Sequence, residues 1–332
     1  MTHRLLHIAN GTSTTRLIQA AGIPGRLSVW CDPLYEGPVP GGIDDGELLR
    51  VRARYLAGAE AESHASDALG LQGWRDVISD VASYDELVLW YEHDLFDQLN
   101  LVQLLSWIDA RPRAPVVVSL IEIGSFPGHP AFMGLGELTP DDIRSLLDSR
   151  AAISEARYAM ATRAWTAFRH STPDMLDALR RSDTATAPFL GAALTRFLEE
   201  YPWVSDGLSR TERRLLEIAA SGPVDLLTTF RRMHEGETAF YVTDLSLLAF
   251  LRGFSRCTPP LISVDAASLD MDRIPAGRLA ITDQGRSILS GDLDRIATYG
   301  IDRWFGGVHL ETGGVIWRWE DSSQRVVAEP RT

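Results

Sequence analysis

The residues best suited to chemistry in this sequence follow a run of apolar and aromatic residues. Leu87 to Tyr91 form that run, and Glu92, His93 and Asp94 come directly after it. The run predicts a buried strand, and in open parallel sheets ligands bind where the strands end. We therefore predict that Glu92, His93 and Asp94 are catalytic residues. A helix should start within three residues, with Gln98 placed away from its buried face and available to bind a ligand.

Other predicted strands also end in polar residues. The first, Arg4 to Ala9, leads into the Asn10-Gly11 turn and a helix capped by Thr12 or Ser13. Further strands are predicted at 27–31 and 116–123. Because parallel strands end at one edge of the sheet, we expect their polar residues to meet there. The expected members of this rim are Asn10, Asp32, Glu36, Glu92, His93 and Asp94, with Glu122 as a further candidate.

Several carboxylates at one rim fit two kinds of site. They could bind a divalent cation through oxygen ligands, for which Asp32, Glu92 and Asp94 are the candidates. They could instead set one raised pKa against one ordinary pKa for acid and base catalysis. In that case His93 or Glu36 would move protons. The residue types alone leave both kinds of site open.

The ligand-binding candidates beside these carboxylates are His7, Asn10, Gly11 and Gln98. Asn10 and the amide of Gly11 would hold oxygen atoms of the ligand. His7 lies inside the first strand, which favours a hydrogen-bonded core histidine; only if it faced the rim would it be a base.

Plainer roles exist for the same residues. Asp94 could be the N-cap of the following helix, Glu92 could pair with an arginine, and His93 could bond a backbone carbonyl. Asp32 and Glu36 share a loop rich in proline and glycine, where both are also ordinary turn residues. A convergence of carboxylates from several strand ends is the observation that would favour a site.

The chain contains no lysine, so all 32 basic residues are arginine. A P-loop, a pyridoxal-phosphate Schiff base and a lysine general base are therefore excluded. No nicotinamide or flavin fingerprint is present, which argues against redox chemistry. The net charge of −13 also argues against a nucleic-acid-binding surface, without excluding one. Any clamp for an anion must use arginine or backbone N–H groups.

Length and composition indicate a globular protein of more than one domain. The chain has 332 residues, of which 45% are hydrophobic and 23% charged. We expect no membrane-spanning segment and no signal peptide, and hence a cytoplasmic location. Cys31 and Cys257 have no neighbouring cysteine or histidine in a metal-binding or redox pattern, so both are expected to be reduced packing residues.

Strands that alternate with helices predict an α/β domain over residues 1–136, with a short parallel Rossmann-like sheet and flanking helices. Its last loop, through Gly136, could lie over the edge of the sheet as a lid. Residues 137–204 should form a helical extension. Residues 205–332 predict a winged-helix-like domain with three helices, beginning with a capping box at Ser209 and Glu212. Two strands follow, and a terminal hairpin should turn at Gly313-Gly314.

Several longer motifs resemble one bacterial family. HIANG at 7–11, WCDPLYEGPVP at 30–40 and LWYEHDLFDQLNL at 89–101 are similar to the motifs of the family known as domain of unknown function 1835. RWFGGVHL at 303–310 and WRWE at 317–320 resemble the tail of its longer members. Thr12 departs from the polar residue, such as aspartate, that we associate with that position. The resemblance supplies a grouping and no activity.

Two classes of function are compatible with these patterns. The first is an enzyme, a hydrolase or group transferase, that acts on a small polar or anionic ligand at the carboxyl edge of the sheet. The second is a ligand-sensing regulator that uses the same rim and contacts DNA or a partner through the C-terminal domain. The predicted third helix of that domain is mainly apolar, which favours burial over the major groove.

Overall fold

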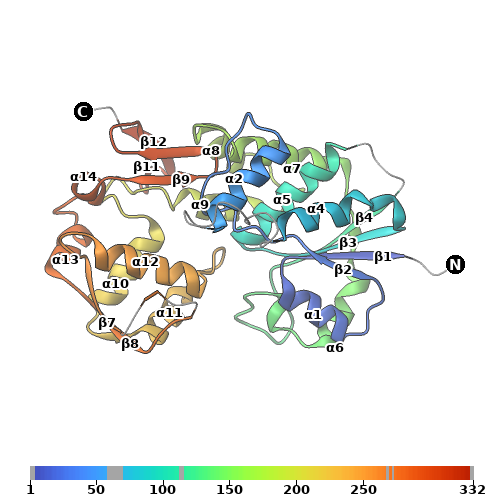
Figure 1. The fold of residues 1–332 in the computed structure, drawn as a ribbon, viewed down its shortest axis with the longest axis horizontal. Coiled ribbons are helices and arrows are strands. Elements are labelled where there is room, and N and C mark those ends of the chain that lie inside the picture. The colour runs from blue at the N-terminus through green and yellow to red at the C-terminus, as the bar shows by residue number, and fades with distance from the viewer. Residues whose placement is uncertain (1–3, 58–69, 112–115, 267–268, 271–272, 330–332) are drawn as a thin grey trace. The chain divides into compact units, whose positions relative to one another are not determined.

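The computed structural model describes residues 4–57, 70–111, 116–266, 269–270 and 273–329. The chain forms two compact units. Unit 1 consists of Met1–Leu194 and Trp304–His309, and unit 2 of Thr195–Arg303 and Leu310–Thr332. Each is described by itself, and the element labels are those of Figure 1.

A five-stranded sheet is the centre of unit 1. Its strand order is β2-β1-β3-β4-β5; the first four strands are parallel and β5 is antiparallel to β4. The predicted parallel α/β sheet is therefore confirmed, with a short antiparallel edge strand added. The strands are β1 (Leu5–Ala9), β2 (Arg26–Val29), β3 (Glu86–Glu92), β4 (Val117–Ile123) and β5 (Ala151–Ala152).

Helices cover both faces of this sheet. Figure 1 shows α1 and α6 on one face and α4, α5 and α7 on the other. The helices of this part of the chain are α1 (Thr12–Ala20), α2 (Asp45–Ala57), α4 (Leu71–Ser79), α5 (Leu95–Asp109), α6 (Pro140–Leu146), α7 (Glu155–Phe168), α8 (Asp174–Arg180) and α9 (Leu190–Leu198), with short 3-10 turns at Val81–Ser83, Leu135–Glu137 and Leu147–Ser149.

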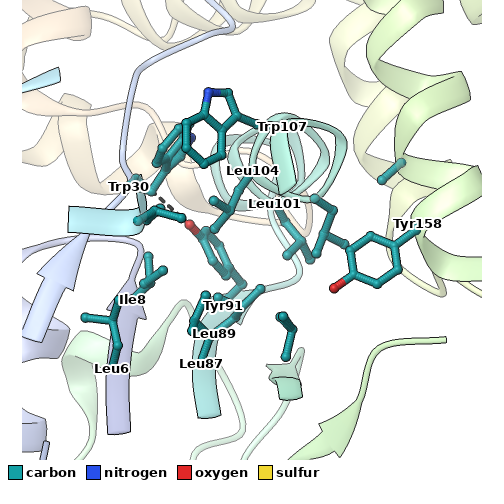
Figure 2. Close-up of a cluster of buried hydrophobic side chains, with 14 residues drawn as sticks. Leu6, Ile8, Trp30, Leu87, Leu89, Tyr91, Leu101, Leu104, Trp107 and Tyr158 are labelled. Carbon is teal, nitrogen blue, oxygen red and sulfur yellow. Dashed lines mark hydrogen bonds between the residues drawn. The ribbon is translucent and has the colours of Figure 1, made fainter. Parts of the chain in front are cut away.

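Strand β3 is buried along its whole length because side chains on both of its faces enter a core. Leu87, Leu89 and Tyr91 pack toward α5, as Figure 2 shows. Val88 and Trp90 pack on the opposite face, toward α1 and α6. The Tyr91 hydroxyl donates to the carbonyl of Trp30 at 3.1 Å, which ties β3 to the end of β2. This two-sided burial explains the continuous apolar run in the sequence.

Helix α5 is also buried on nearly all sides, which differs from the single buried face that we predicted. Gln98 and Gln103 are 1% and 3% exposed. Their amides are satisfied inside the protein; Gln103, for example, accepts a hydrogen bond from Trp30 at 2.8 Å. The helix lies between the sheet and α7, which together bury most of its side chains.

Unit 2 begins with three helices and a three-stranded antiparallel sheet of order β6-β8-β7. The capping box of Ser209 and Glu212 is present at the start of α10, as predicted. Small antiparallel sheets make up most of the remaining chain. The elements that follow α9 in the chain are α10 (Arg210–Ala220), β6 (Val224–Asp225), α11 (Leu226–His234), α12 (Asp244–Arg256), β7 (Ile262–Ala266), β8 (Gly277–Ile281), α13 (Asp283–Leu289), α14 (Arg295–Tyr299), β9 (Asp302–Phe305), β10 (Val308–Glu311), β11 (Ile316–Glu320) and β12 (Arg325–Glu329). Part of β9 and part of β10 lie in Trp304–His309, which belongs to unit 1.

Two local predictions are wrong. The chain does turn near Gly313, but the strands on either side of that turn do not pair with each other: β10 pairs with β9, and β11 pairs with β12. The N-cap of α1 is Gly11 rather than Thr12 or Ser13, and it makes no side-chain cap. In the described part of the chain, no helix has both the length and the apolar character needed to cross a bilayer.

Candidate functional site

Three side chains meet at the carboxyl edge of the sheet in unit 1. The amide nitrogen of Asn10 donates to Oε1 of Glu92 at 2.9 Å and to both carboxyl oxygens of Asp97 at 3.1 Å. The Thr14 hydroxyl donates to the amide oxygen of Asn10 at 2.7 Å, which orients that amide. We call these three residues, together with Asp94 two residues after Glu92, the acidic cluster.

The fold brings these residues together through neighbouring strands. β1 and β3 are parallel neighbours, with Ala9 opposite Trp90, so Asn10 and Glu92 emerge at the same edge. Asp94 caps α5 by accepting from the backbone N–H of Asp97 at 2.8 Å. That cap places Asp97 in the first helical turn, where its carboxylate accepts from the backbone N–H of Glu92 at 2.5 Å. The plain capping role predicted for Asp94 is therefore present.

A segment after β4 covers the Glu92 carboxylate. The backbone N–H of Leu135 donates to Oε1 of Glu92 at 2.6 Å. A Cβ atom on Gly134 would lie only 2.4 Å from Oε2 of the same side chain, so the backbone of Gly134 packs directly on it. Gly134 and Leu135 stand at the end of the loop that we predicted to lie over the sheet edge, and both contact Glu92. Glu92 is 6% exposed in this arrangement.

Burial raises the pKa values of all three carboxyl groups in the cluster. Burial, followed by repulsion from Asp94, raises the pKa of Glu92 to about 8. Burial raises the pKa of Asp94 to about 6. The pKa of Asp97 lies well above its ordinary value because of burial and the neighbouring charges of Glu92 and Asp94. These raised pKa values favour a cluster that keeps a proton at neutral pH.

His93 and Gln98 have different surroundings. The ring centroid of His93 lies 6.3 Å from that of Phe132 and 6.0 Å from that of Phe189. Gln98 donates to the carbonyl of Glu92 at 2.7 Å and to the carboxylate of Glu122 at 2.9 Å. It therefore links the end of β3 to the end of β4.

Glu122 also forms a buried ion pair. Nη2 of Arg157 lies 2.7 Å from Oε1 of Glu122, and both side chains are less than one-tenth exposed. Nη1 of Arg157 donates to the carbonyl of Thr186 at 2.7 Å. Glu122 therefore has a structural partner and stabilises the edge beside the cluster.

Asp32 has a structural role in this arrangement. Its carboxylate receives three hydrogen bonds from the Arg52 guanidinium at 2.6 to 3.2 Å, and both side chains are buried. Arg52 also binds the carbonyls of Pro33 and Glu36 at 3.0 and 2.6 Å. The arginine thus holds the 32–36 loop in place. Because Arg52 occupies both oxygens of Asp32, the proposed metal-binding or catalytic role of Asp32 does not fit the structure.

His7, Gly11 and Glu36 complete the predicted set. His7 is fully buried in the sheet, where Trp90 donates to its Nδ1 at 3.1 Å and its Nε2 lies 3.2 Å from the carbonyl of Pro24. It is the core histidine that the sequence favoured and not a ligand-binding residue. A Cβ on Gly11 would meet nothing within 4 Å, so open space lies beside Asn10. Glu36 is partly exposed in the loop held by Arg52.

Sequence reasoning missed Asp97. The signal was present: Asp97 stands three residues after Asp94, the spacing at which an N-cap side chain meets the N3 backbone of its helix. An acidic residue at that position is common in the first turn of a helix, so the spacing alone does not distinguish helix capping from a site.

The acidic cluster does not fit a resident cation. The Glu92 and Asp97 carboxylates both accept from the amide nitrogen of Asn10. This N–H donor occupies the position between the two carboxylates, and a cation there would need oxygen ligands. Across the described ranges, no group of three or more His, Cys, Asp or Glu side chains is arranged to hold a metal ion.

Comparison with protein-family models and with curated proteins finds no match to this chain.

Proposed function

We propose that unit 1 is a hydrolase or group transferase that acts on a small polar or anionic ligand at the carboxyl edge of its sheet. One observation carries this proposal: two buried carboxyl groups, Glu92 and Asp97, bind the same amide nitrogen of Asn10. Burying acidic groups side by side destabilises a fold unless they keep a proton, and such groups are typical of acid and base catalysis.

Each member of the cluster has a role in this proposal. Glu92 keeps its proton near neutral pH and acts as the general acid, because its pKa is about 8. Asp94, whose pKa is about 6, is the general base. Asp97 and Asn10 position Glu92, and the open space beside Gly11 is where ligand oxygens would bind.

The proposed reaction balances as follows. Asp94 accepts a proton from water or an acceptor hydroxyl, and that oxygen forms a bond to the electrophilic centre of the substrate. The bond to the leaving group breaks, and the leaving oxygen or nitrogen takes the proton of Glu92. The proton on Asp94 then returns to Glu92, directly or through water. Access to Glu92 requires the backbone at 134–135 to move away from its carboxylate.

The experiment uses chromogenic p-nitrophenyl esters, phosphates and glycosides as probe substrates. Glu92→Gln and Asp94→Asn should lower turnover by about 100-fold or more, the usual contribution of a general acid or base. Asp141→Asn is the matched control, since it removes the same charge from a side chain that is 91% exposed. Absence of wild-type turnover on the whole panel, or equal turnover by Glu92→Gln, would reject the proposal.

The second candidate is a ligand-sensing regulator. We propose the winged-helix-like arrangement for residues 205–332; the element order α10-β6-α11-α12-β7-β8 and the sheet order β6-β8-β7 support it. The mainly apolar sequence of α12 is unsuited to a DNA major groove, which favours a protein partner over DNA. A gel-shift assay with random-sequence duplex DNA, run at low salt, tests the DNA-binding form, and an unshifted duplex contradicts it.

We also propose the grouping with the bacterial family domain of unknown function 1835. The motifs at 7–11, 30–40 and 89–101 support it. In the fold these motifs supply Asn10, the loop held by Arg52, and Glu92 with Asp97. A grouping of this kind carries no reaction, so the proposed activity rests on the acidic cluster alone.

A further inference from the structure

A cavity of about 560 Å³ lies in unit 1 near the start of β4. Because the acidic cluster lies at the carboxyl ends of the parallel strands, this cavity is at the opposite edge of the sheet. Its walls come from the end of α4 and the turn after it, the end of α5, the start of β4, and the β5–α7 segment. The side chains that matter for the argument are Val81, Trp107, Ile108, Arg111, Val118 and Tyr158.

The cavity is lined mainly by side chains of the hydrophobic core. Trp107, Val118 and Tyr158 belong to the core cluster drawn in Figure 2. Val81 and Ile108 are only partly buried where they pack against that cluster and line the cavity. Val117, at the start of β4, is 52% exposed. Apolar surface is thus left in contact with water, and an apolar ligand would remove it from water.

Arg111 places a positive charge at this apolar cavity. Its Nη1 donates to the carbonyl of Trp107 at 2.8 Å, and its guanidinium carbon lies 3.0 Å from the centroid of the Trp107 ring. The Asp45 carboxylate is 3.9 Å from Arg111 but is held at 3.0 Å by both Arg75 and the indole nitrogen of Trp107. The side chain of Arg111 is 41% exposed, so an incoming anion can reach it.

We propose that this cavity binds a small amphipathic carboxylate. Its apolar body lies against Trp107 and Tyr158, and its carboxylate pairs with Arg111. The volume lies in the range of small-molecule sites, and a wall of apolar and aromatic side chains with few polar groups is typical of them. Glu155, the only acidic residue among the described lining residues, is exposed in the first turn of α7 and disfavours an anion there. The carboxylate therefore binds at the Arg111 end.

The site is independent of the proposed catalytic function. No residue of the acidic cluster lines the cavity, and Arg111 takes no part in the proposed reaction. Variants at the cavity should therefore leave Glu92 and its pKa unchanged. Failure of either proposal leaves the other standing.

The test uses full-length protein and the neutral fluorophore 1-N-phenylnaphthylamine, which brightens in apolar sites. Decanoate and decanol are the competitors, because they share an apolar chain and differ in the headgroup. Wild-type protein should bind the fluorophore and release it to decanoate at lower concentration than to decanol. Arg111→Gln should weaken competition by decanoate at least tenfold and leave that by decanol unchanged, since one charge-assisted hydrogen-bonded pair is lost.

Two further variants locate the site. Ala82→Trp adds bulk at an exposed lining position and should abolish fluorophore binding while the melting temperature stays near wild type. Arg16→Gln, on the exposed side of α1, removes the same charge away from the cavity and should change nothing. No fluorophore binding by wild type, or binding that survives Ala82→Trp, overturns the site. Equal competition by decanoate and decanol overturns the assigned carboxylate.

Discussion

The Asp97 carboxylate accepts a hydrogen bond from the backbone N–H of Glu92 at 2.5 Å. It also accepts from the side-chain amide of Asn10, which donates to the Glu92 carboxylate as well. One aspartate therefore contacts both the main chain and the side-chain partner of the same glutamate. Because Asp97 is 1% exposed, its position is set by packing and these contacts. The geometry of Glu92 is thus determined by α5 as much as by its own strand.

The first prediction concerns the pH dependence of stability. The pKa of Glu92 is about 8 in the folded protein against an ordinary value of 4.5, so the folded state binds the proton more tightly. The stability from this protonation is fully present below pH 4.5 and is lost as the pH rises through about 8. Each unit of pKa difference corresponds to about 1.4 kcal/mol.

Glu92→Gln removes this dependence because glutamine does not ionise. We expect the variant to be more stable than wild type at pH 9 and to lose that advantage toward pH 5. Thermal unfolding at pH 5, 7 and 9 measures the difference, with Asp141→Asn as the exposed control. An equal loss of stability at all three pH values would show that Glu92 is not protonated in the fold.

The second prediction concerns the cover over Glu92. Gly134→Ala places a Cβ where Oε2 of Glu92 stands 2.4 Å away, so the segment must move off the carboxylate. The Leu135 amide, which donates to Glu92, should then exchange its hydrogen faster, by tenfold or more, in hydrogen–deuterium exchange. Gly136→Ala is the matched control, because its Cβ would meet only Ser13, at 3.7 Å. Equal exchange in both variants would contradict this account.

The third prediction concerns the loop at 32–36. Arg52→Met leaves the buried Asp32 carboxylate without its guanidinium and should lower the free energy of unfolding by about 3–5 kcal/mol. Adding Asp32→Asn to that variant should recover part of the loss, because no uncompensated charge then remains. Chemical denaturation of the two variants and the wild type measures this. A double variant no more stable than Arg52→Met would argue against a buried ion pair.

The fourth prediction compares two arginines of unit 2. Arg196 is 4% exposed and binds the carboxylates of Glu200 and Glu237 at 2.6 and 2.8 Å. Arg256 pairs with Asp270 at 2.8 Å, but both side chains are 63% exposed. Arg196→Met should cost several kcal/mol, about 3–5, and Arg256→Met no more than about 1 kcal/mol. Similar losses of stability in denaturation experiments would refute the difference.

Much of the parallel sheet was predictable because its strands are buried on both faces. Such strands appear as uninterrupted apolar runs, as at 87–91, and the polar residue after each run marks the edge of the sheet. Asn10 and Glu92 do meet there for this reason. The start of α10 in unit 2 was predictable from its capping box at Ser209 and Glu212.

The remaining errors concern contacts between residues far apart in the sequence. Asp32 looked like a rim ligand because its partner, Arg52, lies 20 residues away on α2. Gln98 looked exposed because a polar side chain in a helix is usually solvated, whereas it donates hydrogen bonds to the ends of β3 and β4. The Gly313-Gly314 pair indicates a turn but does not determine which strands pair. In the structure β9 pairs with β10, and β11 pairs with β12.

The return of the chain to unit 1 at Trp304–His309 affects how the protein can be divided. Within unit 1, the carbonyl of Gly306 accepts from the amide of Val39 at 2.8 Å, and Gly307 donates to the carbonyl of Phe168 at 3.0 Å. A fragment that ends at Leu194 would lose both contacts and expose the backbone beside Val39. A faithful isolated form of unit 1 would need these six residues attached through a designed linker or supplied as a separate peptide.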